Sequence, residues 1–562
     1  MAAGARPGLG LLCAAIAACG GEPRADIVLR GGVVIPIVPR EARAQAVAIH
    51  ADTIVFVGPD SLVTAWIGRA TEVIELDGRA VLPGFHDLHV HPIKGGLELG
   101  GLDLNDGAAV HEILQRVAGY AAAHPDAAWI RGRGWSLPLF PGGNPHKRLL
   151  DSIVPDRPVY LMAQDAHSAW VNSAALASAG VTAATPDPPG GQIERDVAGR
   201  PTGTLRESAM RLVDRVMPPP GPADYGHALQ DALRRAARFG ITALHDANAG
   251  APHLEAYGAF AAQGLLTARI TAVVGLDPDT LSGAPAPAPA GAPPLLRVTG
   301  FKLFLDGVLE AHSAALLEPY IDPPRNRGPT RIARDRLFEL VTALEGRGDQ
   351  LHFHAIGDRA VRDALDAIAH ARAVNGAPGP EGLPPLLAHL QLVHPDDVPR
   401  FAALDAVAVF QPLWAWRDDY ITELTEPRIG AARSRRLYPM GSLDAAGATI
   451  AAGSDWPVTT MDPWRAIQVA VTRRRPEAEA GPPWLPAETL TLRTALEAYT
   501  INGARAAGLA ARTGSLEPGK AADLVVVDRD PFAIPAHALR EVSVQLTILR
   551  GRVIYAGPEM ED

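Results

Sequence analysis

The sequence predicts an α/β protein whose main domain is a closed barrel of eight parallel strands, the (β/α)8 or TIM-barrel architecture. Eight short apolar runs lie along the middle of the chain, and most are followed by alanine-rich segments that favour helices. Strands that alternate with helices in this way form parallel sheets, and eight such strands close a barrel. The candidate strands lie near residues 81–91, 240–247, 268–275, 297–305, 351–355, 386–390, 406–411 and 449–455.

The first residues predict an export signal over 1–24. The apolar stretch 9–20 follows a single arginine, Arg6, and is too short to span a bilayer. The sequence Ile16-Ala17-Ala18-Cys19 resembles a bacterial lipobox, which predicts a periplasmic protein held at a membrane by a lipid on Cys19. An ordinary cleaved signal is the alternative. Because both cysteines fall in this stretch, the rest of the chain offers no disulfide and no thiolate ligand.

Short β-rich runs broken by glycines occur near both ends of the chain and predict a small β-sandwich domain, formed by residues 25–80 and 508–562. The barrel domain then covers residues 81–507. The gap between the first two candidate strands is too long for a loop in a compact domain, so residues of about 120–210 are expected to form a β-containing insertion. A segment rich in proline and alanine, 284–294, indicates a linker or surface loop.

Composition limits the classes of molecule that the protein is expected to bind. The 562 residues are 47% hydrophobic and carry a net charge of −10, so the chain can bury a large core and offers no basic surface for nucleic acid. We expect a small-molecule substrate, no nucleic-acid partner, and membrane contact only through the lipid on Cys19. The oligomeric state stays open, with a homodimer as one option.

The first candidate strand contains a metal-binding pattern. Alternate side chains of a strand share a face, so Asp87, His89 and His91 are expected to point to the same spot. Two imidazoles at this spacing suit Zn²⁺. Taken alone, the pattern fits a polar strand end with unrelated histidines equally well. The residues at the ends of the other strands decide between this alternative and a metal site.

Four more polar residues stand at or near the ends of later candidate strands: Lys302 in the fourth, His354 in the fifth, His389 in the sixth and Asp455 after the eighth. In a closed barrel, the carboxyl ends of the strands meet at one rim, where catalytic residues lie. With the two histidines of the first strand, this set suits one or two divalent ions, Zn²⁺ first and Mn²⁺ as an alternative. A carboxylate able to take a proton from water completes it.

Lys302 is unusual for this chain, which has four lysines against 48 arginines. It lies inside the apolar run 298–305, where a permanent charge would be costly. A buried lysine loses its proton readily and can then add to carbon dioxide, forming a carbamate that bridges metals. The alternative is an unmodified structural lysine paired with Asp306 or another acid.

Residues that contact the substrate are expected above the strand ends. We assign this role to His167 in the insertion, to His245 at the end of the second strand, and to two tryptophans beyond the seventh and eighth strands, Trp414 and Trp456. A structural role is the alternative for His167, and mutual orientation with Asp246 is the alternative for His245. The tryptophans suggest an apolar substrate group, although ordinary loop packing explains them equally well. His352 shares a face with His354 but lies deeper in the strand, so we interpret it as a packing residue or one that supports a ligand.

The chain resembles the amidohydrolase superfamily, and within it amidohydrolase family 3, the N-substituted formamide deformylase-like branch. The resemblance covers nearly everything after the signal and rests on five main segments: 82–91, 301–307, 354–361, 453–458 and 517–524. It implies that the metal ligands are His89, His91, Lys302, His354 and His389, with Asp455 as ligand and general acid/base. Two positions depart from the family pattern, because Ala388 stands where a glutamate is frequent and His86 where an apolar residue is frequent.

The predicted function is metal-dependent hydrolysis of a carbon–nitrogen bond other than a peptide bond, in an N-acyl, N-formyl or cyclic amide. Water activated by the metal would attack the carbonyl, and Asp455 would carry the proton to the departing nitrogen. An esterase or lactonase at the same centre is the nearest alternative. A regulatory or binding lipoprotein without activity is the alternative from a different class, because a fold does not dictate function.

Overall fold

The computed structural model describes residues 24–560, apart from residues 41, 106, 277–294, 323 and 380–381. The predicted signal over 1–24, with Cys13 and Cys19, lies outside the described residues except for Arg24, and so does the segment 284–294. None of the helices in the described part of the chain combines the length and apolar character needed to span a bilayer.

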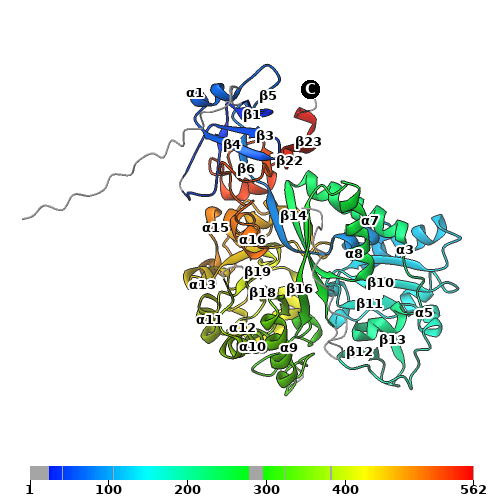
Figure 1. Cartoon of the computed structure of the whole chain (residues 1–562). Coiled ribbons are helices and arrows are strands. Elements are labelled where there is room, and N and C mark those ends of the chain that lie inside the picture. Colours follow the sequence, from blue (N-terminus) through cyan, green and yellow to red (C-terminus); the bar gives the residue numbers. More distant parts are fainter. Residues whose placement is uncertain are drawn as a thin grey trace, which may run out of the picture.

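Eight parallel strands form the central sheet, as predicted (Figure 1). In order around the sheet they are β7 (Phe85–Val90), β14 (Ile241–Ala249), β15 (Arg269–Gly275), β16 (Leu296–Phe304), β17 (Gln350–Ala355), β18 (Leu386–His389), β19 (Val407–Phe410) and β20 (Ile450–Ala452). Two backbone hydrogen bonds beyond β20 close the barrel onto β7, from Asp455 N to the His89 carbonyl at 2.7 Å and from His91 N to the Trp456 carbonyl at 2.9 Å.

Helices cover the outside of the barrel, the longest being α7 (Pro222–Arg238), α9 (Arg334–Gly346) and α10 (Asp358–Asn375). The sequence of α7 explains why it forms and how it packs. Asp224 accepts a hydrogen bond from the Gly221 N–H at 2.7 Å and so satisfies a free donor at the start of the helix. Its buried residues recur at the three- and four-residue spacing that puts them on one face: Ala228, Leu229, Ala232, Leu233, Ala236 and Ala237.

The first predicted strand, 81–91, is two strands. β6 (Ala80–Pro83) belongs to a different sheet, and β7 begins after a single intervening residue, Gly84. A Cβ at Gly84 would lie 2.3 Å from Thr242 Oγ1, so glycine is required where the chain passes between the two sheets. The apolar run continues through the break because both strands are buried, which is why the sequence pattern did not reveal it.

The two ends of the chain build a pair of sheets above the barrel in Figure 1. One contains β4 (Thr53–Gly58), β3 (Ala46–His50), β1 (Ile27–Arg30) and β5 (Glu72–Glu75), and the other β2 (Val33–Val34), β6, β21 (Leu524–Val527), β22 (Val544–Leu549) and β23 (Arg552–Ala556). Leu29 and Ile49 from the first sheet share a core with Val526 and Ile548 from the second. A buried ion pair at 2.6 Å, between Arg269 of β15 and Asp523, joins this unit to the barrel.

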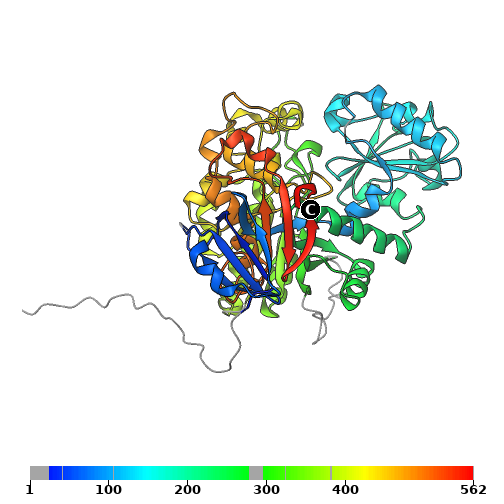
Figure 2. The ribbon, with the colours of Figure 1, turned by 90° about the horizontal axis from the view of Figure 1, so that it is seen from above.

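The insertion has a six-stranded sheet and hydrophobic cores of its own, and it lies to one side of the barrel (Figure 2). Its strands are β12 (Gly191–Arg195), β13 (Pro201–Glu207), β11 (Ser168–Val171), β10 (Val159–Ala163), β9 (Ile130–Trp135) and β8 (Leu102–Asp103). Glu207 at the end of β13 accepts a hydrogen bond from Ser313 Oγ at 2.6 Å and pairs with Arg331. Both partners lie in the loop after β16, so the insertion is held against the rim where the strands end.

Candidate metal centre

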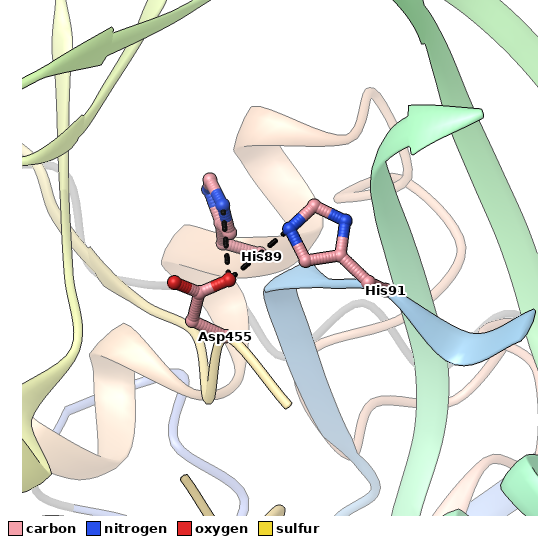
Figure 3. Close-up of side chains that lie close together, drawn as sticks. All are labelled: His89, His91 and Asp455. Carbon is pink, nitrogen blue, oxygen red and sulfur yellow. Dashed lines mark ion pairs between the residues drawn. The ribbon is translucent and has the colours of Figure 1, made fainter. Parts of the chain in front are cut away.

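Two histidines and an aspartate meet where β7 and β20 end (Figure 3). His89 belongs to β7, His91 follows its last residue, and Asp455 lies in the loop after β20. Asp455 Oδ1 is 3.1 Å from His91 Nε2 and 3.5 Å from His89 Nε2. The three ligand atoms all lie within 4.8 Å of one another, so the three side chains can bind one ion.

The close approach of β20 to β7 depends on a glycine. A Cβ at Gly453 would lie 2.5 Å from the His89 backbone nitrogen, so a larger residue would push the two strands apart. Asp87 then holds the loop, because it accepts hydrogen bonds from the Ser454 N–H at 2.9 Å and from the Ser454 hydroxyl. The expectation that Asp87 converges with the two histidines is therefore wrong, since its carboxylate is used by the loop. Asp455, and not Asp87, supplies the carboxylate that lies beside His89 and His91.

The other predicted ligands lie on neighbouring strands and line the same cavity of about 780 Å³. The ring centroid of His389 on β18 is 4.7 Å from that of His89 and 4.5 Å from that of His354 on β17. Lys302 on β16 is buried, and its Nζ has no hydrogen-bond partner among the described residues. All six predicted residues thus surround one space. Which of them bind the ion stays a prediction.

The charge state of these groups fits a metal. Burial, with help from the neighbouring charge of Lys302, holds the pKa of His89 well below its usual value, and burial lowers the pKa of His389 to about 3. These rings are therefore neutral and offer a lone pair, as metal ligation requires. Burial would raise the pKa of Asp455, but the hydrogen bond and charge of His91 outweigh it, so the pKa falls and the carboxylate is ionised.

Lys302 differs from a structural lysine. Burial lowers the pKa of its amine to about 7, although the charges of Asp455 and Asp246 oppose this shift. Asp306, the partner considered from the sequence, accepts hydrogen bonds from the backbone N–H groups of Gly357 at 2.8 Å and Ala315 at 2.9 Å instead. The interpretation of Lys302 as the ion-pair partner of Asp306 is therefore wrong. The amine is left free toward the cavity.

Further side chains orient the ligands from behind. His89 Nδ1 lies 2.9 Å from His352 Nε2, and His389 Nδ1 donates to Gln411 Oε1 at the same distance. Each contact occupies Nδ1 of its ring, and in His89 it leaves Nε2, which lies 3.5 Å from Asp455 Oδ1, to bind an ion. For His89 Nε2 to present its lone pair, Nδ1 must carry the proton, so His352 Nε2 is the acceptor.

Replacing His352 with phenylalanine is expected to weaken metal binding about 10- to 100-fold, which is the usual effect of losing a group that orients a ligand. Competition with a chromogenic chelator measures the dissociation constant. His352→Gln should recover part of the affinity, because its amide oxygen can accept the same hydrogen bond. His111→Phe, at an exposed position, is the matched control. An unchanged constant in His352→Phe would contradict this orienting role.

The structure does not bring two of the predicted substrate contacts to the cavity lining. Neither His245 nor Trp456 belongs to the described residues that line the cavity. His245 lies beneath it, with its ring centroid 5.2 Å from that of His352 and both ring nitrogens buried without a partner. Trp456 packs outward against the helix α2 (Pro92–Leu99), where a Cβ on Gly95 would lie 2.3 Å from its ring.

His167 and Trp414 do line the cavity. The centroid of the His167 ring is 5.3 Å from that of His354, and its Nδ1 is 2.8 Å from Glu207 Oε2. Burial alone would raise the pKa of Glu207, but the His167 and Arg331 charges outweigh it and lower the pKa to about 2. Trp414 lies parallel to His389, with an interplanar angle of 2° and centroids 5.6 Å apart. Their contact with substrate stays a prediction.

Sequence reasoning missed another part of the cavity lining. Glu310, Gln391, Asp418 and Tyr438 face the same space from the loops after β16, β18 and β19. Glu310, Asp418 and Tyr438 do not stand at the end of an apolar run, so the pattern that found the ligands could not find them. One available signal was that Gln391 follows His389 by two residues.

A closed parallel barrel with a histidine and aspartate group at its strand ends defines the class of barrel-fold, metal-dependent hydrolases. A model of the amidohydrolase family matches residues 72–555, and the chain belongs to that family.

Similar proteins extend over most of the chain. Protein LONG AFTER FAR-RED 3 of Arabidopsis thaliana is 31% identical over 94% of this chain and 92% of its own length. The N-substituted formamide deformylase of Arthrobacter pascens is 28% identical over 94% of this chain and 98% of its own. The crystal structure of an uncharacterized metal-dependent hydrolase from Pyrococcus horikoshii superposes with a TM-score of 0.71 at 25% identity, covering 91% of this chain and 99% of that one.

Proposed function

We propose that this amidohydrolase cleaves a carbon–nitrogen bond other than a peptide bond, in an N-acyl, N-formyl or cyclic amide. The observation that carries the proposal is the position of Asp455, whose carboxylate lies against both His89 and His91 at the open end of the barrel. The similarity to an N-substituted formamide deformylase supports this choice of bond.

We propose Zn²⁺ as the ion, in one or two copies, with Mn²⁺ as the alternative. When bound, the ion supplies an activated water and polarises the substrate carbonyl. Asp455 holds and moves the proton. Its Oδ1 faces the two histidines, while its Oδ2 lies 4.0 Å from His389 Nδ1 and is free to accept a proton. The same carboxyl then delivers this proton to the nitrogen that leaves, which an amide needs because its anion leaves poorly.

The test is an assay of the metal-loaded protein, without residues 1–24, on a matched panel of N-acyl amides, N-formyl amines, lactams, esters and lactones. We expect turnover of at least one amide class. Turnover of esters and lactones alone would favour the esterase alternative. No turnover of any substrate with Zn²⁺ or Mn²⁺ bound would favour a regulatory or binding role.

We propose that Lys302 is carbamylated. At a pKa of about 7, a large fraction of its amine is neutral at neutral pH, and the free Nζ can add to carbon dioxide with release of one proton. Carbon NMR of protein equilibrated with isotopically labelled bicarbonate is expected to show a carbamate signal that is absent from Lys302→Arg. Lys147→Arg is the control, because that lysine lies in the insertion away from the cavity. A signal that survives in Lys302→Arg would contradict the assignment.

We further propose that the protein is exported and held at a bacterial membrane by a lipid on Cys19. The lipobox-like sequence is the support for this proposal.

A further inference from the structure

One wall of the cavity is acidic and aromatic, and the hydrolytic role described above does not use it. We define this acid wall as Glu310, Asp418, Tyr438, Trp414 and Trp416, all of which line the cavity. It comes from the loops that follow β16 and β19, together with the segment before the helix α13 (Met440–Ala445). Because Trp414 is stacked on His389, the wall begins beside the metal centre.

Glu310 carries a negative charge that no close cation balances. It is 8% exposed and accepts hydrogen bonds from two neutral donors, Gln391 Nε2 at 2.9 Å and the Thr425 hydroxyl. Among the described residues, no basic nitrogen lies within 4 Å of it. Arg428 acts on it from farther away and donates its own Nη1 to the Leu424 carbonyl at 2.6 Å.

Three of the arginines that line the cavity have acidic partners. Arg331 pairs with Glu207, and both Arg465 and Arg475 pair with Glu477. These three arginines are thus each paired with a carboxylate, whereas Glu310 has no such partner among the described residues. A buried charge is costly unless it is paired. A cation bound beside Glu310 would therefore stabilise this part of the cavity.

Tyr438 lies in the same wall. It is 4% exposed and lines the cavity with Glu310 and Asp418. Burial, and then the negative charges of Glu310 and Asp418, raise the pKa of the Tyr438 hydroxyl well above its usual value, so it stays neutral. Asp418 accepts one hydrogen bond, from the Ile421 N–H at 2.9 Å, and burial with the nearby charge of Glu310 raises its pKa to about 7.

The aromatic residues of the wall also suit a cation, in particular an ammonium group. An ammonium group over the face of a tryptophan or tyrosine is attracted by the ring electrons, more strongly when water is excluded. Trp414, Trp416 and Tyr420 all border the cavity here. The charge of Asp165 in the insertion acts on Tyr420, and Asp165 Oδ2 is buried without a hydrogen-bond partner among the described residues.

We propose that the acid wall binds a protonated amine carried by the substrate, close to the bond that is cleaved. The substrate class would then be N-acyl compounds with a cationic amino group on a short chain. The ammonium donates hydrogen bonds to Glu310 and Asp418, lies against Trp414, and leaves the scissile carbonyl at the histidines. This inference rests on the proposed amide hydrolysis and specifies its substrate.

The test compares three substrates of similar length: N-acetyl-1,4-diaminobutane, which is cationic, N-pentylacetamide, which is neutral, and 4-acetamidobutanoate, which is anionic. The cationic compound is expected to have a kcat/KM about 10- to 100-fold above that of the neutral one, the usual strength of a hydrogen bond to a charged group. Asp418→Asn and Glu310→Gln should each reduce this preference. Glu423→Gln is the control, since it removes an exposed charge from the same segment and should keep the preference.

A binding measurement separates the two proposals. Calorimetric titration of the metal-loaded protein with benzyltrimethylammonium, and with neopentylbenzene as its uncharged counterpart, reports on the acid wall without any turnover. Binding of the ammonium that Asp418→Asn weakens, together with no cleavage of any amide, would support the wall and contradict amide hydrolysis. Equal cleavage of the cationic and neutral amides, with no ammonium binding, would overturn the acid wall and leave the hydrolysis standing.

Discussion

Replacing Asp455 with asparagine is expected to lower kcat for an amide about 10²- to 10⁴-fold, the usual contribution of general acid–base catalysis. The amide of asparagine keeps the size of the side chain but cannot take up and return a proton at neutral pH. At saturating Zn²⁺ the ion is expected to remain, because His89 and His91 are unchanged. Steady-state kinetics and elemental analysis of the same preparation measure both quantities.

Asp396→Asn is the control for this variant, because that carboxylate has a side-chain exposure of 80% and lies on the outside of the molecule. Ester substrates add a second comparison. An alkoxide leaves more readily than an amide anion, so Asp455→Asn should harm ester cleavage less than amide cleavage. Full activity on amides in Asp455→Asn would remove this residue from the mechanism.

Removal of the metal is expected to abolish turnover, and addition of Zn²⁺ should restore it. The bound ion supplies the activated water, which no group of the protein replaces in this role. Binding also stabilises the folded state, by about 2.7 kcal/mol at a free metal concentration 100 times the dissociation constant. Chelation should therefore lower the thermal unfolding temperature as well as the activity.

The variant His89→Ala tests whether this response comes from the described centre. Zn²⁺ should restore neither activity nor thermal stability in this variant, whereas His111→Ala, at an exposed position, should respond like the unmodified protein. If His89→Ala regained full activity with Zn²⁺, the catalytic ion would have to bind elsewhere.

The barrel and the cluster of candidate ligands could be predicted because one pattern encodes both. An apolar run that ends in a polar residue places that residue at the rim, and parallel strands bring their ends together. His354 and His389 follow this rule on consecutive strands, and Asp455 follows it just after the last, whereas Lys302 was found because a lysine inside an apolar run is unusual in this chain.

The errors arose where regular strand geometry did not hold. The pairing of β14 with β7 shifts register twice, between Ile241 and Ala243 and between Leu244 and Asp246. Alternation of faces along such a strand does not tell whether His245 reaches the cavity. The carboxylate of Asp87 accepts a hydrogen bond from Ser454 instead of facing the two histidines. Because Ser454 is distant in sequence, this contact could be found only in the folded chain.

The acid wall was hidden for a related reason. Glu310 lies in a single 3-10 turn (Leu309–Ala311) and Tyr438 in a bend, and both segments are too short for a periodic pattern to predict where a side chain points. Their proximity follows from the way the loops after different strands fold over the barrel.

Gly84 has a consequence for protein engineering. One residue separates the last N-terminal strand of the terminal sheets from the strand that carries His89, so the two units share a nearly continuous ribbon. An excised barrel would have to begin at this junction, losing the anchoring of its first strand immediately before the metal-binding pair. Grafting this catalytic unit onto another scaffold would therefore mean transplanting both termini with it.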